Sequence, residues 1–173
     1  LPFVGAAGRL LGGLLALIGL QRGDVFITNV VKCHPPANRD PEPDEIAACA
    51  PFLRRQMEIL DPLIVVPLGR HALRAFAPTA KISAAHGSVT AASPGAPLPE
   101  DSTLLPLYHP AAALHNGSLR PTLERDVAAL ARVLDPARTR RATLRGEGGA
   151  ATLSQIQEPP EQRQLQQIGR AHV

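Results

Sequence analysis

The sequence has 173 residues, of which 45% are hydrophobic, so it is long enough for one domain with a substantial core. Its two cysteines are too few for a secreted disulfide scaffold, and no apolar run reaches the roughly 18 residues of a membrane span. The formal charge of +3 and the isoelectric point near 9.4 permit nucleic acid as a partner without requiring it.

Helices and strands alternate along the first half of the sequence. Leucines at helical spacing predict a helix within residues 6–20. A β-branched run predicts a short buried strand at residues 24–31, which a proline-rich loop follows. Proline and acidic residues then open a helix over residues 43–60. Its predicted apolar face consists of Ile46, Cys49, Ala50, Leu53, Met57 and Leu60.

The alternation continues in the second half. Continuous apolar runs predict strands at residues 62–69 and 102–110, with a short helix at residues 70–77 after the first. A further helix is predicted over residues 120–135. This order predicts an α/β fold, with three α/β/α layers around a short, mainly parallel sheet.

The composition changes after Asp135. Residues 136–173 are rich in arginine, glutamine, glycine and proline, which predicts a disordered tail. Within it, residues 167–173 (QIGRAHV) resemble a translated sequencing adapter. We therefore expect one domain at residues 1–135, and we interpret nothing in residues 167–173 as functional.

Polar residues follow three predicted strands, at the carboxyl ends where α/β proteins place their working residues. They fall into three groups, residues 29–33, 69–71 and 109–110. Each also has an ordinary structural interpretation: Asn29 as a turn residue, His71 as part of an exposed strand-to-helix turn, and His109 as a satisfied histidine. Taken alone, Cys33 and Cys49 are by default two free buried thiols rather than metal ligands. Spacing alone leaves the function open.

Four segments occur in the order that is typical of one known family. They are PFVGAAGRLL from residue 2, TNVVKCHPP from residue 28, the pair Cys33 and Cys49, and YHPAAAL from residue 108. Together they resemble the family-4 uracil-DNA glycosylases, the iron–sulfur branch of that superfamily, over residues 1 to about 135. The resemblance implies a DNA repair enzyme, a cytoplasmic and monomeric bacterial protein, that hydrolyses the N-glycosidic bond of uracil in DNA and leaves an abasic site.

The resemblance also implies roles for individual residues. Phe3 would stack on the flipped uracil, and the Asn29 amide would hydrogen-bond its edge, which suits uracil and mismatches cytosine. His109 would approach O2 of uracil, where negative charge builds as the bond breaks. Cys33 and Cys49 would supply two of the four thiolates of a structural [4Fe–4S] cluster.

Two features typical of the family are not present upstream of PFVG: a Cys-x-x-Cys pair and an acidic loop. We therefore expect the other two cluster ligands, and the residues that orient water and exclude thymine, in a preceding segment. On this interpretation the sequence by itself is inactive.

The contacts to the DNA backbone depart from the family pattern. Ala111 stands where the family has serine, so it offers a backbone N–H but no hydroxyl. Leu114 would be the wedge that fills the vacated base stack. Three basic residues of the proline-rich loop would face DNA phosphates, or form a solvated charge set: Lys32, His34 and Arg39.

Two alternatives belong to other classes. One is a non-catalytic DNA- or partner-binding domain, related to the N-terminal domain of phage-type DNA polymerases. The other is a different α/β enzyme such as a nucleotide hydrolase, which the lack of a G-x-x-x-x-G-K-[ST] phosphate loop disfavours.

Overall fold

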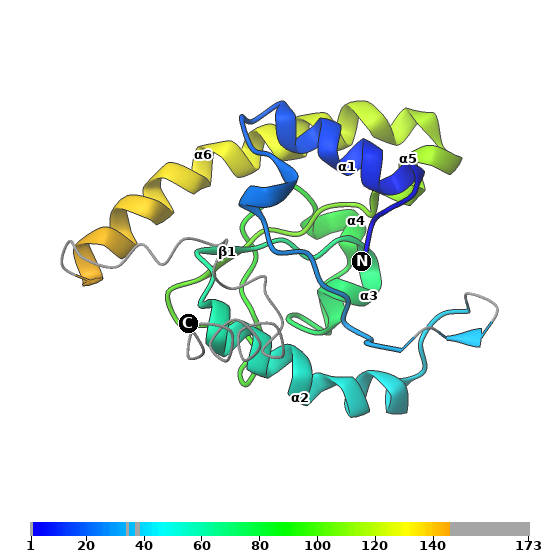
Figure 1. Cartoon of the computed structure of the whole chain (residues 1–173), viewed down its shortest axis with the longest axis horizontal. Helices are drawn as coiled ribbons and strands as arrows, with labels where there is room; N and C mark the ends of the chain where they lie inside the picture. The colour runs from blue at the N-terminus through cyan, green and yellow to red at the C-terminus, as the bar shows by residue number, and fades with distance from the viewer. Residues whose placement is uncertain (1, 34, 37–38, 146–173) are drawn as a thin grey trace, which may run out of the picture.

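The computed structural model describes residues 2–33, 35–36 and 39–145. The helices, strands and 3-10 turns along this part of the chain are α1 (Ala6–Ala16), η1 (Arg22–Asp24), α2 (Pro43–Leu60), β1 (Ile64–Val65), α3 (Gly69–Arg74), α4 (Ile82–Ala85), β2 (Thr103–Leu104), α5 (Pro110–His115), η3 (Gly117–Leu119) and α6 (Arg120–Arg145). Figure 1 shows α1 and α6 on one side of the molecule and α2 on the opposite side.

The two strands of the described residues pair in parallel, as the sequence predicts. Ile64 lies opposite Thr103 and Val65 opposite Leu104. A single further bridge joins Leu68 to Leu107. The strands are shorter than the predicted runs, because only part of each apolar run forms the ladder.

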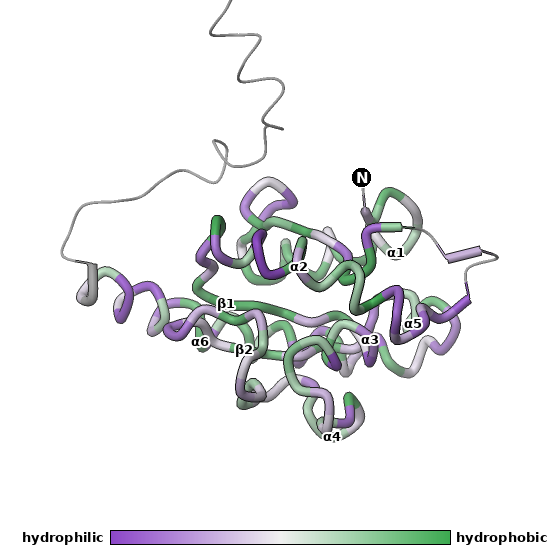
Figure 2. The backbone as a smooth tube through the Cα atoms, turned by 90° about the horizontal axis from the view of Figure 1, so that it is seen from below, coloured by the Kyte–Doolittle hydropathy of each residue, from purple (hydrophilic) through white to green (hydrophobic). Residues whose placement is uncertain are grey.

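Alternating side chains of the sheet divide the core in two. Val65 and Leu104 pack on one face, against α2, α3 and the residues that follow α3; their main buried partners are Leu53, Met57, Leu73 and Phe76. Leu105 and Leu107 point to the other face, against α1 and α6; their main buried partners are Leu14, Leu123, Val127 and Leu130. Figure 2 shows the strands between α2 and α6. The predicted three-layer α/β/α arrangement is confirmed.

The prediction of a strand at residues 24–31 is wrong. The chain runs there without strand pairing, and among the described residues no backbone–backbone hydrogen bond involves residues 25–31. The segment lies along α2 instead, where the Thr28 hydroxyl donates to Gln56 Oε1 at 3.1 Å. β-Branched residues favour an extended backbone, but a strand also requires a neighbouring edge with which to pair.

The last helix extends beyond the predicted limit at Asp135. It continues through Pro136 to Arg145, so residues 136–145 are helical where the sequence predicts disorder. Ala137 is buried on this extension, and Arg141 donates hydrogen bonds to the backbone carbonyls of Asp61 and Pro62. These tertiary contacts offset the hydrogen bond that a proline removes from a helix. Residues 146–173, with the expected tail and adapter-like end, lie outside the described residues.

Candidate functional site

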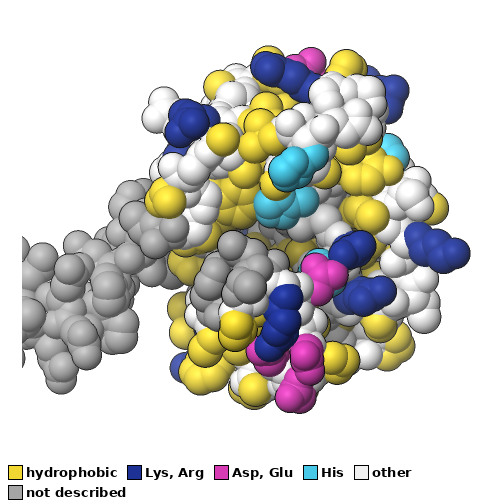
Figure 3. Space-filling view, turned by 90° about the vertical axis from the view of Figure 1, so that its right-hand side faces the viewer, with side chains coloured by type: hydrophobic (Ala, Val, Ile, Leu, Met, Phe, Trp, Pro, Cys, Tyr) yellow, Lys and Arg dark blue, Asp and Glu magenta, His cyan; other side chains and the backbone are white. Residues whose placement is uncertain are grey.

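Phe3 and His109 lie side by side at the end of the sheet where the chain leaves β2 and enters α5. Their ring centroids are 5.3 Å apart and their planes differ by 27°. Both side chains are half-buried. Figure 3 views the molecule from the right-hand side of Figure 1 and shows a hollowed face with histidine, lysine and arginine side chains around it. The structure thus brings together two of the three residues predicted to contact the base and its leaving group.

The backbone of Phe3 is held in an uncommon conformation. Its φ angle is +63°, in the left-handed region that residues with a side chain seldom adopt. Its carbonyl oxygen rests against Gly8 of α1 so closely that a methyl group at residue 8 would overlap it. Gly8 therefore permits this close approach, and the packing on α1 fixes where the Phe3 ring lies.

The protonation state of His109 follows from its surroundings. Its Nδ1 accepts a hydrogen bond from the Ala111 backbone N–H at 3.1 Å, so in the neutral ring the proton is on Nε2. Burial lowers the pKa of His109, which favours the neutral form. His109 therefore presents a neutral imidazole whose Nε2–H can donate a hydrogen bond to an oxyanion.

Gly69 supports His109 from the neighbouring strand end. Its φ angle is +84°, and its N–H donates to the Leu107 carbonyl oxygen at 2.8 Å. A methyl group at residue 69 would lie 3.0 Å from His109 Cβ. The sequence places Gly69 at a strand end but does not indicate this contact, because Gly69 and His109 lie far apart along the chain.

Asn29, the third predicted base contact, lies in the unpaired segment that follows η1. It is exposed, and its backbone carbonyl accepts from Lys32 Nζ at 2.6 Å. Among the described residues, the one hydrogen bond found for Asn29 is this backbone contact, and none joins its side chain to Phe3 or His109. The role of Asn29 as a base contact therefore stays a prediction.

The residues predicted to contact DNA differ in whether their binding groups are exposed or already hydrogen-bonded within the chain. Leu114 is 50% exposed on α5. The Ala111 N–H is engaged by His109 Nδ1. Lys32 Nζ donates to three acceptors at 2.6 to 2.8 Å, the Asn29 carbonyl, Thr28 Oγ1 and Gln56 Oε1. Partial burial lowers the pKa of Lys32, and the nearby Cys49 opposes that shift. The Lys32 ammonium therefore stabilises the chain's own loop in this structure.

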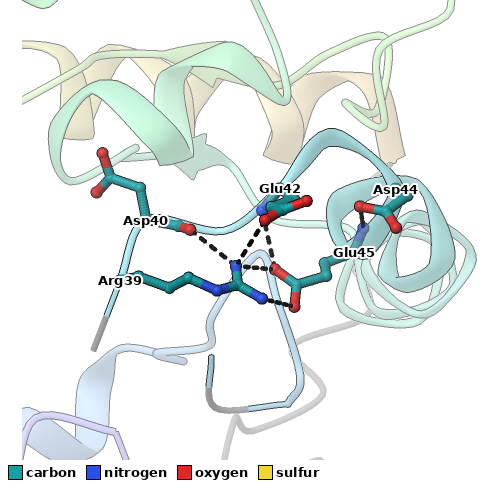
Figure 4. A network of polar contacts seen from close by, with 5 residues as sticks. All are labelled: Arg39, Asp40, Glu42, Asp44 and Glu45. Carbon is teal, nitrogen blue, oxygen red and sulfur yellow. Dashed lines mark hydrogen bonds and ion pairs between the residues drawn. The ribbon is translucent and has the colours of Figure 1, made fainter. Parts of the chain in front are cut away.

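Arg39 is likewise bound within the chain. Its guanidinium forms a two-pronged contact with the Glu45 carboxylate, at 2.8 and 2.7 Å. Figure 4 shows it between the Asp40 backbone and the carboxylates of Glu42 and Glu45. Hydrogen bonds from Arg39 and from the Glu42 N–H lower the pKa of Glu45 to about 2. This cluster fixes the end of the proline-rich loop to the start of α2. His34, the remaining basic residue of the loop, lies outside the described residues.

The two cysteines approach one another through the fold. Cys49 is buried on α2, and its Sγ accepts a hydrogen bond from the Lys32 backbone N–H at 3.2 Å. Cys33, the next residue after Lys32, is exposed. The interpretation as two buried thiols therefore fails for Cys33. No group of three or more histidine, cysteine, aspartate or glutamate side chains that could hold a metal is found among the residues that the structure describes.

Comparison with known proteins identifies the family. The profile of the uracil DNA glycosylase superfamily matches residues 1–132. A type-4 uracil-DNA glycosylase of Sulfurisphaera tokodaii is 48% identical over 130 residues, which cover 72% of this chain and 58% of that protein. One from Pyrobaculum aerophilum is 40% identical over 147 residues, which cover 79% of this chain and 74% of that protein.

A weaker likeness extends to a DNA polymerase of Bacillus phage SP01, with 30% identity over 132 residues that make up 14% of the polymerase. The matched part of the chain covers 58% of the Sulfurisphaera tokodaii protein and 59% of a type-4 uracil-DNA glycosylase of Saccharolobus solfataricus, so the chain spans less than two thirds of the length of these relatives. Within the described residues, no helix has both the length and the apolar character to cross a membrane. The chain belongs to the uracil DNA glycosylase superfamily and, by its likeness to these relatives, to its type-4 family, as the four sequence segments predict.

Proposed function

We propose that the chain forms the base-binding and leaving-group part of an enzyme that hydrolyses the N-glycosidic bond of uracil in DNA. The observation that carries this proposal is the Phe3–His109 pair, with an apolar ring beside a neutral Nε2–H donor. A flipped pyrimidine needs a flat apolar surface, and its departing anion needs a donor at O2. The likeness to type-4 uracil-DNA glycosylases supports uracil as the base.

The residues would divide the work as follows. Phe3 stacks on the base, and the Asn29 amide donates to O4 and accepts from N3–H once the exposed segment that carries it closes over the base. The His109 Nε2–H binds O2 more tightly as negative charge develops there, which lowers the barrier without a protein nucleophile. Water attacks the sugar carbon, and residues beyond this site orient it.

The cysteine pair fits one edge of a [4Fe–4S] cluster. The Lys32 N–H already donates to Cys49 Sγ, a bond that stabilises a cluster thiolate, and Cys33 follows directly. The sequence contains only these two cysteines, so two further ligands would come from outside it. When bound, the cluster supplies cross-links rather than catalytic chemistry, and its role would be to hold the proline-rich loop against α2. Iron analysis of the complete gene product should give about four irons per chain, and Cys49→Ala should remove most of them.

The proposed reaction is tested by product analysis with the complete gene product that contains these residues. Single-stranded oligonucleotides with one uracil, thymine or cytosine are incubated with enzyme, and free base and abasic sites are quantified. We expect uracil release alone. Asn29→Asp should lose most uracil release or gain cytosine release, because a carboxylate accepts but does not donate. No release of uracil from any substrate would refute the proposal.

The phage polymerase likeness favours one alternative, a non-catalytic DNA-binding domain. Its identity of 30% is lower than the 40% to 48% shared with the glycosylases named above. The same experiment separates the two, since a binding domain would retain the oligonucleotide and release no base. We also propose that the protein acts as a monomer in the bacterial cytoplasm, and the elution volume in size-exclusion chromatography tests the monomer.

A further inference from the structure

His86, the residue directly after α4, is paired with a buried carboxylate from α6. Its Nδ1 lies 2.7 Å from Oδ2 of Asp126. Because a carboxylate oxygen accepts hydrogen bonds and donates none, His86 Nδ1 carries the proton of this bond. The side chain of Asp126 is 6% exposed and that of His86 is 22% exposed. A buried carboxylate needs such a partner, so the pair fixes both side chains in place.

Gly87 allows this pair to form and ties it to the chain that follows β2. Its φ angle is +70°, and a methyl group at residue 87 would overlap the Asp126 carboxylate. The Gly87 N–H donates to the Pro106 carbonyl oxygen at 2.8 Å. The turn at residues 86–87 is therefore held by α6 on one side and by the segment between β2 and α5 on the other.

The His86 ring packs on Tyr108, which directly precedes His109. The two ring centroids are 4.4 Å apart and the planes differ by 35°. Tyr108 is half-buried and also packs against the core cluster that includes Leu107 and Leu123. Since the peptide between Tyr108 and His109 is planar and rigid, the setting of Tyr108 decides the direction in which the chain enters His109.

His109 is supported both at its side chain and at its backbone. Gly69 lies against its Cβ, and Phe3 packs beside its ring, so these two contacts act on the side chain. The contact between His86 and Tyr108 acts instead on the backbone that leads into His109. The buried pair is therefore placed to influence where the His109 ring points.

We propose that Asp126 and His86 are positioning residues for the reaction: they hold the Tyr108 ring, and through it the backbone of His109, so that the His109 Nε2–H stays aimed at O2 of the departing base. The inference rests on the proposed function for the identity of the reaction. Displacements of about 1 Å at a reacting group can cost roughly 100-fold in rate, so a smaller shift of His109 should cost about tenfold.

The first test is the single-turnover rate of uracil release by the complete gene product, with enzyme in excess and well below the unfolding temperature. His86→Ala and Asp126→Ala should each lower the rate about tenfold and leave oligonucleotide affinity, measured by fluorescence anisotropy, nearly unchanged. The double variant should be no slower than either single variant, because both changes remove one support. Asp126→Asn keeps an acceptor oxygen for His86 Nδ1 and should restore most of the rate.

Tyr108 offers a second pair of variants that leaves the buried carboxylate with its partner, so it tests the inference even if the pair variants fail to fold. Tyr108→Leu removes the ring contact with His86 and should lower the rate as His86→Ala does, whereas the conservative Tyr108→Phe keeps a ring there and should not. Arg141→Met is the control for stability, since it removes contacts near the other end of α6. It should lower the unfolding temperature without slowing the folded enzyme.

The second test follows the His109 ring without uracil or excision. The Nδ1 of His109 accepts a hydrogen bond and that of His86 donates one, so the two neutral rings carry their protons on opposite nitrogens and differ in their ¹⁵N spectra. In the complete gene product, His109 should show the Nε2-protonated form. In His86→Ala and Tyr108→Leu its signals should move toward a mixture of the two tautomers.

Three results would overturn the inference: rates of His86→Ala and Tyr108→Leu equal to that of the parent, a loss of rate no larger than that of Arg141→Met, or His109 signals that none of the variants changes. If the signals shift as expected and the parent releases no uracil, the positioning role is supported and the proposed function fails. Uracil release at the parent's rate by every variant would have the opposite meaning.

Discussion

Gly69 offers a sharp test of how the fold positions His109. At φ +84°, an alanine costs about 1–2 kcal/mol in backbone strain, and its methyl group would lie 3.0 Å from His109 Cβ. That distance is shorter than ordinary carbon–carbon contact, so His109 must shift by a few tenths of an ångström or more. Displacements of about 1 Å at a reacting group can cost roughly 100-fold in rate. We therefore expect Gly69→Ala, made in the complete gene product, to reduce single-turnover uracil excision by about 10- to 100-fold.

Gly95 is the matched control for Gly69. Its φ angle is +77°, and a methyl group there would meet nothing within 4 Å. Both alanine variants should lose about 3–6 °C in unfolding temperature from backbone strain. Only Gly69→Ala should also lose excision rate, measured with enzyme in excess over a uracil oligonucleotide. Equal rates for the two variants would show that the contact between Gly69 and His109 does not position the catalytic ring.

Three further predictions concern stability. His86→Ala leaves the carboxylate of Asp126, 4% exposed and 2.7 Å from His86 Nδ1, without this hydrogen-bond partner, so the free energy of unfolding in urea should fall by about 1–3 kcal/mol; a variant as stable as the parent would contradict the pairing. Glu45→Gln should lower the unfolding temperature at pH 7. Because the pKa of Glu45 in the folded protein is about 2, the difference in unfolding temperature between parent and variant should shrink as pH falls from about 4.5 toward 2. A difference that stays constant with pH would refute the Arg39 contact as its source. Arg141→Met should cost about 1–2 kcal/mol in the same urea assay, because the Arg141 side chain is only 13% exposed and its guanidinium binds backbone carbonyls; no change would mean that the end of α6 does not stabilise the domain.

Sequence patterns predict the elements that are stabilised locally. Helix α2 begins at Pro43 and ends at Leu60 as predicted, because proline and acidic residues favour its first turn and one face is apolar. The parallel sheet follows from two apolar runs separated by a helix. The unpaired segment at residues 24–31 shows the limit of this reasoning, since β propensity does not reveal whether a partner strand is present.

In the candidate site, too, sequence patterns identify individual residues but not the contacts that depend on distant parts of the chain. Phe3 and His109, which the sequence segments single out, lie side by side, and their roles stay predictions. The partners of Lys32 could not be predicted, because Gln56 lies on a different element and only the fold brings the two together. The contact between Asp40 and Arg70 spans 30 positions for the same reason. Patterns in sequence identify chemical groups, whereas long-range packing decides which groups remain available to a ligand.

The central claim is that the His109 Nε2–H stabilises the departing uracil anion. The measurement is the single-turnover rate of uracil release by His109→Ala, with oligonucleotide affinity measured in parallel and His115→Ala as the control from the same short helix. The rate should be lower by roughly 10²–10³ with nearly unchanged affinity, because the hydrogen bond strengthens only as charge develops on O2. An unchanged rate for bound His109→Ala enzyme, or a loss of affinity alone, would contradict this claim.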